Sequence, residues 1–435
     1  MIKFNTLRVT NILLASAGLV LILIFILTGQ GNLLYDEFNF VPNIFLLEKY
    51  GLSNQFLLNI KGSAGPAYGV YHHCFFYIQP FDIMTVRLAN YSLLLVLLAS
   101  IYFNARLLGY KDPLILTLNF IAIPFVWVFC GLGLTEVPTM ACGSIGFFFF
   151  LKGILSDIKF RNRPGWVAAS GIFFSFSVMG RSFYLMAIIA TLCWFGINLL
   201  QKSKTGLSPN SISSFTTKQL LILLFVFVMT ALPLPLYVFN LWGALTPPLG
   251  TEAVGANKIA VNLWYGILAC SYSGVIALIL APSWFLFKKK YSPVWAAISV
   301  VLVLINIYFG IFEFAPLHDT VAKLLPAGLF VHYGNIMPGL LASVALWFLI
   351  STVYQLWLRK DDSVYVLIGM ISLFIVFSAI KVTTQFSSRY VGQAIPFFIL
   401  MFAPYEKINL AKIIRILLGL AIGALSLYSY YNGKF

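Results

Sequence analysis

Long apolar runs, separated by short charged segments, constrain this chain more than any other feature. In the first run, no residue between Arg8 and Asp36 carries a charge. A helix that crosses a bilayer needs about 20 apolar residues. Inside the bilayer every backbone polar group must also be hydrogen-bonded within the protein, which a helix achieves by itself. Runs of this length therefore restrict the chain to a bundle of membrane-spanning helices.

The composition agrees with this architecture. Hydrophobic residues make up 60% of the 435 residues and charged residues only 9%, whereas a soluble domain has about 25% charged residues. The sequence predicts an all-α polytopic membrane protein with about 11–13 transmembrane helices. We expect residues 1–435 to form a single transmembrane domain, with an uncleaved first span and no separate soluble domain.

Charged residues bound the predicted spans, whose edges are defined to within a few residues. The predicted spans are residues 11–30, 84–104, 114–131, 137–151, 165–180, 183–200, 219–239, 263–287, 292–312, 336–357, 363–380, 391–405 and 412–430.

The distribution of positive charge predicts the orientation of these spans. If the N-terminus is cytoplasmic, roughly two thirds of the 28 Lys and Arg fall on the cytoplasmic side, as the positive-inside rule requires. The net charge of +15 is then spread over short loops, which argues against a nucleic-acid partner. The compact chain, without retention signals or luminal domains, favours a bacterial plasma membrane over the endoplasmic reticulum.

The first outer loop, about residues 31–82, is the longest segment between predicted spans. In residues 38–50, polar side chains stand among apolar ones at a spacing that fits an amphipathic helix on the membrane surface, and Gly51 is a typical helix end. A turn at residues 61–66 leads into a second short helix, from Pro66 through Tyr77. The loop therefore predicts two short helices on the membrane surface.

Two adjacent carboxylates, Asp36 and Glu37, directly follow the first span. They are either solvated loop charges or a general base beside a second polar group, placed where a membrane-held substrate can reach them. A third outer carboxylate, Glu136, lies in Thr135-Glu136-Val137-Pro138. There Thr135 could cap the helix that follows, with Glu136 in its first turn, which is the structural alternative to a catalytic role.

Four basic positions lie at the same outer side as the carboxylates. Arg87 opens the second span, Arg181 lies in a tight outer turn, and Lys381 precedes Arg389-Tyr390 near a late span. An Arg at a membrane boundary either extends its charge to lipid headgroups or binds a phosphate, for which the guanidinium is well suited.

Histidines and cysteines give no metal signature. His72 and His73 are adjacent and point to different faces of a helix, so they do not share a metal, although either could contact a sugar or a phosphate. His318 and His332 are expected in the loop after the ninth span, and the five cysteines have no metal-ligand spacing. The sequence also lacks the phosphate-binding loops and hydrolase motifs of nucleotide-driven or triad enzymes.

Five short motifs follow one another on the outer side. They are Tyr35-Asp36-Glu37-Phe38, Val86-Arg87-Leu88-Ala89-Asn90, Thr135-Glu136-Val137-Pro138, Gly180-Arg181-Ser182, and Arg389-Tyr390 followed by Pro396. Their order and sidedness resemble the GT-C class of membrane glycosyltransferases, which includes protein O-mannosyltransferases, bacterial aminoarabinose transferases and dolichyl-phosphate-glucose-dependent glucosyltransferases. The resemblance covers roughly residues 1–405, although Gly65-Pro66-Ala67-Tyr68 replaces the Pro-rich stretch usual in the first loop.

The resemblance implies transfer of a sugar from a polyprenyl-phosphate donor to a lipid, glycan or protein acceptor on the extracytoplasmic side. By family analogy Asp36 deprotonates the acceptor hydroxyl, and Glu37 and Glu136 orient acceptor or sugar hydroxyls. Arg389, Lys381 or Arg181 stabilises the leaving lipid phosphate. Relatives that use a monophosphate donor commonly need no metal, so no cofactor is expected, with a divalent cation as the alternative.

Two other functions fit parts of the sequence. A transporter or flippase for lipid-linked sugars would carry its charges near the membrane midplane, in broken helices, whereas here they cluster at one interface. A polysaccharide polymerase or ligase usually has its large outer loop late in the chain, whereas here the first loop is the longest.

Overall fold

The computed structural model describes residues 2–29, 31–76, 82–155, 160–205, 215–250, 261–285, 292–311, 325–382 and 386–432. Within these ranges the regular structure is entirely helical. Nine helices of the described residues are long and apolar enough to cross a membrane. The predicted all-α, multi-pass architecture is therefore confirmed.

Helices of 10 to 32 residues fall where the sequence predicts spans. They are α1 (Ile2–Thr28), α6 (Ile83–Leu107), α9 (Glu136–Leu155), α10 (Arg163–Gly180), α11 (Leu185–Thr205), α12 (Thr217–Ala231), α13 (Pro233–Trp242), α15 (Leu263–Leu280), α16 (Ser292–Phe309), α18 (Ala327–Leu358), α19 (Ser363–Phe377) and α22 (Leu410–Tyr431). Three predicted spans contain only shorter apolar helices, at Pro113–Ala122, Pro293–Phe309 and Ile395–Tyr405. Together with α10 (Arg163–Gly180), which is not among the nine, these three account for the difference from the thirteen predicted spans.

The predicted span 114–131 is the clearest correction, because it is not one continuous helix. It folds as α7 (Pro113–Leu118), the 3-10 helix η1 (Asn119–Ala122) and α8 (Val126–Gly131). Pro124 lies at the break, where a ring without an N–H cannot continue the helical hydrogen bonds. Trp127 bridges the interruption by donating its Nε1–H to the Ile121 carbonyl at 3.0 Å.

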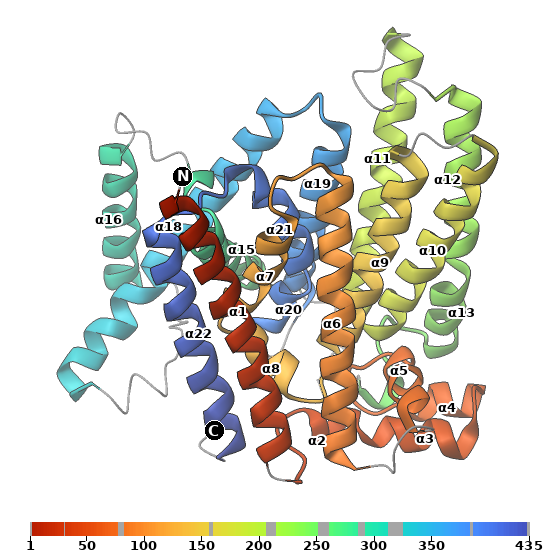
Figure 1. Ribbon diagram of the computed structural model, residues 1–435, viewed down its shortest axis with the longest axis horizontal. Coiled ribbons are helices and arrows are strands. Elements are labelled where there is room, and N and C mark those ends of the chain that lie inside the picture. The colour runs from red at the N-terminus through yellow and green to blue at the C-terminus, as the bar shows by residue number, and fades with distance from the viewer. Residues whose placement is uncertain are drawn as a thin grey trace.

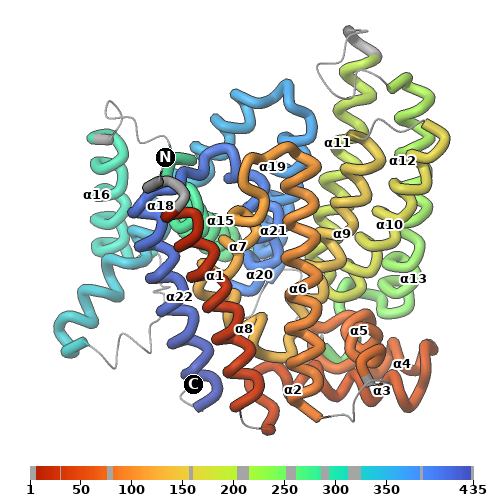
Figure 2. Tube along the Cα trace, viewed as in Figure 1, coloured from red at the N-terminus to blue at the C-terminus, as the bar shows by residue number. Residues whose placement is uncertain are grey.

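The helices are arranged as one bundle with two recognisable sides (Figures 1 and 2). α9, α10, α11 and α12 stand together, with α10 packed between α9 and α12. On the other side α1 packs against α22, so that the first and last helices are neighbours and run in the same direction. The C-terminal end of α22 therefore lies at the same end of the bundle as the loop that follows α1.

Four short helices lie across that end of the bundle (Figure 1). They are α2 (Glu37–Phe40), α3 (Pro42–Tyr50), α4 (Asn54–Asn59) and α5 (Ala67–Phe76). The predicted helix over residues 38–50 is α2 and α3, divided before Pro42, and Gly51 ends it with a φ of 59°. The predicted second helix is α5, α4 was not foreseen, and Tyr77 lies outside the described residues.

A close backbone contact fixes this loop on the bundle. Gly65 N donates a hydrogen bond to the Gly180 carbonyl at 3.1 Å. A Cβ atom at Gly65 would lie only 1.8 Å from the carbonyl oxygen of Met179, so no other residue fits without movement of the backbone. The loop is thereby held against the turn after α10, where Arg181 lies.

Candidate active site

Four charged side chains, distant in the sequence, meet beneath the short helices of the first loop. Asp36 directly precedes α2, Glu136 is the first residue of α9, Arg181 follows α10, and Arg389 begins the short α20 (Arg389–Gly392). Each stands where a helix begins or ends, which places its polar side chain at the end of the bundle rather than along the middle of a span.

The carboxylate of Glu136 is the centre of this cluster. Its Oε1 accepts hydrogen bonds from Arg181 Nη2 and Arg389 Nε, both at 2.7 Å. Arg389 Nη2 lies 2.6 Å from the same oxygen. Arg389 continues to Asp36, donating from Nη1 to Oδ2. The order Asp36, Arg389, Glu136, Arg181 therefore alternates in charge, and the two carboxylates balance the two guanidinium groups.

The members of this cluster differ in how far other molecules can reach them. The Asp36 side chain is 31% exposed, whereas Arg389 and Glu136 are 9% and 1% exposed. Glu136 Oε2 is buried and makes no hydrogen bond with any described residue. Asp36 is thus the carboxylate that a substrate can approach, while Glu136 holds the two guanidinium groups in place.

The charge of Arg389 is secured by its neighbours. Burial alone would lower the pKa of Arg389, but the carboxylates of Glu136 and Asp36 outweigh it and raise the pKa above the usual value. The guanidinium therefore remains a permanent cation inside a nearly enclosed site.

Aromatic rings complete the cluster, and sequence reasoning assigned them no role. The Phe40 ring centroid lies 5.1 Å from the guanidinium carbon of Arg181 and 5.5 Å from that of Arg389. The Tyr35 ring lies 5.6 Å from Arg389. Tyr35 has a φ of 52°, the only positive φ of a non-glycine residue in the described ranges. Such a backbone costs about 1–3 kcal/mol and is typical of functional sites; the Tyr-Asp-Glu-Phe motif was the available signal.

Arg181 also binds two hydroxyl groups. Its Nε donates to Thr135 Oγ1 at 2.5 Å, and its Nη1 donates to Ser63 Oγ at 2.8 Å. The Thr135 hydroxyl, considered above as a helix cap, thus orients Arg181. Ser63 belongs to the predicted turn at 61–66, so the first loop contributes directly to the site.

Glu37 and Arg87 form a separate ion pair, fully enclosed by protein. Arg87 Nε and Nη2 donate to the two oxygens of Glu37 at 2.9 and 2.7 Å. The backbone N–H groups of Leu34 and Gly133 donate to the same carboxylate at 2.8 and 2.7 Å. Side-chain exposure is 0% for Glu37 and 1% for Arg87. Each carboxylate oxygen therefore already accepts two hydrogen bonds from the protein.

Of the remaining predicted site residues, Tyr390 lies beside the cluster and Lys381 lies outside it. Tyr390 packs against Phe183, with ring centroids 5.1 Å apart, directly beside Arg389. Lys381 is exposed at the end of the 3-10 helix η5 (Ser378–Lys381), and no contact brings it into the cluster. His73 is half-buried on α5.

His72 is buried against Tyr68 on α5. Its Nδ1 lies 3.0 Å from the Tyr68 carbonyl, and the two rings are 4.3 Å apart. Burial lowers the pKa of His72 to about 4, so the imidazole is neutral at ordinary pH. The Tyr68 hydroxyl donates to the Gly133 carbonyl at 2.6 Å, next to the Glu37–Arg87 pair. His72 therefore supports the wall of the site.

A metal site would need several His, Cys, Asp or Glu side chains close together. Within the described ranges, no three His, Cys, Asp or Glu side chains come together in a way that could hold a metal ion. His332 is exposed on α18, and His318 lies outside the described residues. The expectation of a reaction without a cofactor stays a prediction.

Among known proteins, this chain is similar to solved structures but not to a family model or a curated sequence. No family model and no curated protein matches the sequence. The fold is similar to that of ArnT from Cupriavidus metallidurans bound to undecaprenyl phosphate, with a TM-score of 0.46 and 14% identity over 97% of this chain and 77% of that one. For ArnT in the apo state the TM-score is 0.43 and the identity 13%, with the same coverage.

Both TM-scores lie below 0.5, and nothing about the chemistry of this chain follows from them.

Proposed function

We propose that this protein is a membrane glycosyltransferase that moves a sugar from a polyprenyl-phosphate donor to an acceptor hydroxyl at the end of the bundle covered by the first loop. The observation that carries the proposal is the accessible Asp36 carboxylate joined to buried Arg389. A base and a phosphate-binding cation are the two groups that this reaction requires, and here they are in direct contact.

The acceptor is activated by Asp36. As the acceptor oxygen forms its bond to the anomeric carbon, its proton passes to an Asp36 oxygen, and the bond from that carbon to the phosphate oxygen breaks. General-base assistance of this kind contributes about 10²–10⁴-fold to a rate. The partial exposure of Asp36 suits it to this role better than Glu136 or Glu37, because both of those are enclosed.

The leaving lipid phosphate gains negative charge as the bond breaks. Arg389 and Arg181 lie on one carboxylate and supply fixed guanidinium groups that can stabilise that charge. They are positioned before the reaction by Glu136, Thr135 and Phe40, so little reorganisation is needed. In this mechanism the guanidinium groups provide the positive charge that a divalent cation would otherwise provide.

Glu37 has a different proposed role from the orientation of hydroxyl groups suggested by the resemblance. With two backbone N–H groups and a bidentate Arg87 on its carboxylate, it has no accessible oxygen to offer a substrate. We therefore assign the Glu37–Arg87 pair to holding the start of α2, and with it Asp36, against α6.

The position of the charges favours a transferase over a transporter. Asp36, Glu136, Arg181 and Arg389 stand where helices start or end, whereas coupling and substrate sites of secondary transporters lie near the midplane.

The experiment is sugar transfer by purified protein in nanodiscs, offered a panel of polyprenyl-phosphate sugars with membrane-lipid and glycan acceptors. Wild type is compared with Asp36→Asn and Glu136→Gln, and with Asp361→Asn, an exposed carboxylate at the opposite end of the bundle, as the matched control. We expect transfer by wild type and by the control, and a loss of at least about 100-fold in Asp36→Asn.

Undiminished transfer by folded Asp36→Asn would overturn the assignment of the base. Absence of transfer by wild type with every donor, together with movement of a lipid-linked sugar across liposomes, would replace the transferase by a flippase.

A further inference from the structure

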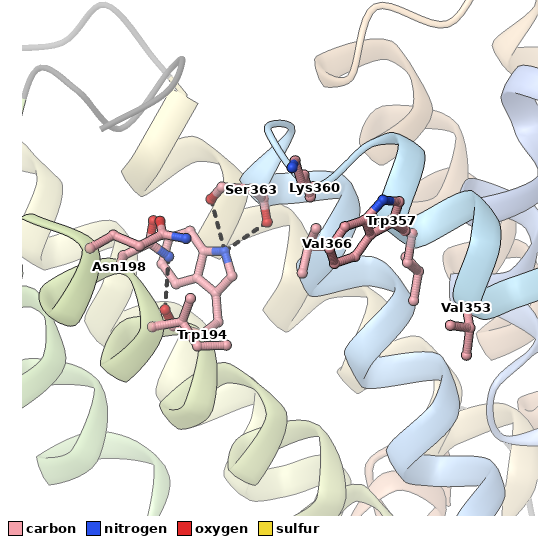
Figure 3. A pocket seen from close by; sticks show the side chains of 10 residues that line it. Trp194, Asn198, Val353, Trp357, Lys360, Ser363 and Val366 are labelled. Atoms are coloured by element: carbon pink, nitrogen blue, oxygen red, sulfur yellow. Dashed lines mark hydrogen bonds between the residues drawn. The ribbon is translucent and has the colours of Figure 1, made fainter. Parts of the chain in front are cut away.

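An apolar groove runs along the last turns of α18, at the end of the bundle opposite the charged cluster. Its upper part is a cleft of about 350 Å³ between α11, α18 and α19 (Figure 3). Beside it, one face of α18 borders a further, open space of about 460 Å³. Val353 and Trp357 line both spaces, so the two are neighbours, and together they form the groove.

The length of the groove matches one leaflet of a bilayer. Leu349, Ile350, Val353, Tyr354 and Trp357 line its lower part. At 1.5 Å per residue, Leu349 and Trp357 are about 12 Å apart along the helix, close to the roughly 15 Å depth of hydrocarbon in one leaflet. The groove can therefore hold one acyl chain beside the helix.

The mouth of the groove has the features of a membrane interface. Trp357 is 68% exposed, and the ammonium of Lys360 lies 4.8 Å from its ring centroid. Tryptophan is enriched at headgroup level, and a lysine there can bind a phosphate. Asp361 and Asp362 follow Lys360 and are exposed, so the mouth carries both signs of charge. This mixture suits a zwitterionic headgroup better than an anionic one.

The inner wall of the cleft contains a hydrogen-bond acceptor that the protein leaves unused. Asn198 is 2% exposed and lines the cleft, and its Nδ2 donates to the Trp194 carbonyl at 2.8 Å. Its Oδ1 is buried and accepts no hydrogen bond from the described residues. Trp194 Nε1 is already satisfied by Ser363, at 2.7 Å from the carbonyl (Figure 3). A buried acceptor of this kind is unfavourable unless a ligand donates a hydrogen bond to it.

We propose that this groove binds one phosphatidylethanolamine molecule of the membrane. One acyl chain lies along Leu349–Trp357, the phosphate meets Lys360, and the ammonium group donates to Asn198 Oδ1. The site is separate from the proposed sugar transfer and does not depend on it.

The test is native mass spectrometry of delipidated full-length protein titrated with phosphatidylethanolamine, phosphatidylcholine or phosphatidylglycerol. Phosphatidylcholine has the same phosphate but no N–H donor. We expect wild type to bind phosphatidylethanolamine about tenfold more tightly than phosphatidylcholine, as one charge-assisted hydrogen bond predicts. Asn198→Leu should abolish this preference, and Lys360→Gln should weaken both lipids about fivefold.

The matched control is Lys152→Gln, since Lys152 lies near the same end of the bundle, over the Trp166 ring at 5.0 Å, but does not line the groove. It should bind all three lipids as wild type does. Because Lys360 is exposed, its variant tests the site even if Asn198→Leu fails to fold. Equal binding of phosphatidylethanolamine and phosphatidylcholine by wild type, tighter binding of phosphatidylglycerol, or no effect of Lys360→Gln would each overturn the proposal.

Discussion

Asp36 and Glu37 are adjacent in the sequence, yet the structure gives them different chemistry. Asp36 is partly exposed and bound to one guanidinium, whereas Glu37 is enclosed and accepts four hydrogen bonds. The difference follows from the helical start at Glu37, which turns the Asp36 side chain outward and the Glu37 side chain inward, towards Arg87 of α6.

The contact between Asp36 and Arg389 predicts competition between the base and the donor phosphate. In Asp36→Asn the guanidinium loses its charged partner, so we expect polyprenyl phosphate to bind at least about fivefold more tightly than to wild type, although turnover is lost. The measurement is the dissociation constant of polyprenyl phosphate by native mass spectrometry. Weaker binding by this variant would show that Asp36 contacts the donor instead of competing with it, and Asp361→Asn should match wild type.

Removal of Arg87 from the Glu37–Arg87 pair should destabilise the protein, and a second substitution at Glu37 should restore the stability. Arg87→Met alone leaves a buried, uncompensated carboxylate, and we expect a loss of about 3–5 kcal/mol in the free energy of unfolding. The double variant Arg87→Met with Glu37→Gln should recover most of it. Thermal unfolding in detergent measures the stability, and sugar transfer by the double variant measures the role of Glu37. A stable double variant without transfer would show that the pair is needed for the reaction and does more than stabilise the fold.

At the scale of elements, the interrupted segment α7–η1–α8 replaces one expected helix by three short ones. The last of them, α8, ends at Gly131, so its final carbonyl groups lack helical partners, and Asn90 of α6 donates to the carbonyls of Phe129 and Leu132. Gly133 follows this helix end and donates its N–H to Glu37, so the early end of α8 contributes to the surroundings of the ion pair.

Removal of the Asn90 amide should therefore destabilise the bundle. Its Nδ2 donates to the carbonyls of Phe129 and Leu132 at 2.7 and 2.6 Å. In Asn90→Leu the Phe129 carbonyl loses this donor, whereas the Leu132 carbonyl keeps the N–H of Leu134 at 2.9 Å, so we expect a loss of about 1–3 kcal/mol, seen as a lower melting temperature. Ser92→Ala, exposed on the same helix, is the control and should change stability by less than about 0.5 kcal/mol. Equal melting temperatures would show that other groups satisfy these carbonyls.

Buried His72 on α5 should make the protein less stable in acid. The pKa of His72 is about 4 in the folded protein and 6.5 in the unfolded chain, so between these values the unfolded chain binds more protons. Stability therefore falls as the pH falls from 6.5 to 4, by about 2 kcal/mol at pH 5 from this group. Thermal unfolding from pH 7.5 to 4.5 should show a weaker dependence in His72→Asn, whereas His332→Asn, which alters an exposed histidine, should follow wild type.

At the scale of the whole molecule, the bundle separates two ends with different character. The charged cluster and the first loop occupy one end, and the groove at Lys360 lies at the other (Figure 1). The positive-inside rule predicts that the first end is extracytoplasmic.

A native cysteine can test this orientation. Cys74 is exposed on α5, in the first loop. In a variant that keeps Cys74 alone, we expect a membrane-impermeant maleimide to label intact cells. A second variant with Lys202→Cys as its only cysteine, near the end of α11, should react after permeabilisation alone. The opposite pattern would invert the orientation and place the charged cluster in the cytoplasm.

The sequence by itself determined the helical class, the positions of most spans and the residue types of the site. These depend on hydropathy and charge along the chain, which are local properties: α1, α6, α9 and α22 follow directly from their apolar runs. The order of the motifs also singled out Asp36, Glu136, Arg181 and Arg389 before their contacts were known.

The tertiary structure alone decided which of these groups meet. Sequence spacing could not show that Arg389 contacts both Asp36, 353 positions away, and Glu136, 253 positions away. Nor could it show that Arg87 forms a buried ion pair with Glu37. It gave no reason to expect the positive φ of Tyr35, Phe40 between two guanidinium groups, or Lys381 outside the cluster. The physical reason is that ion pairing in a membrane bundle depends on which helix ends come together, and packing between distant helices decides that.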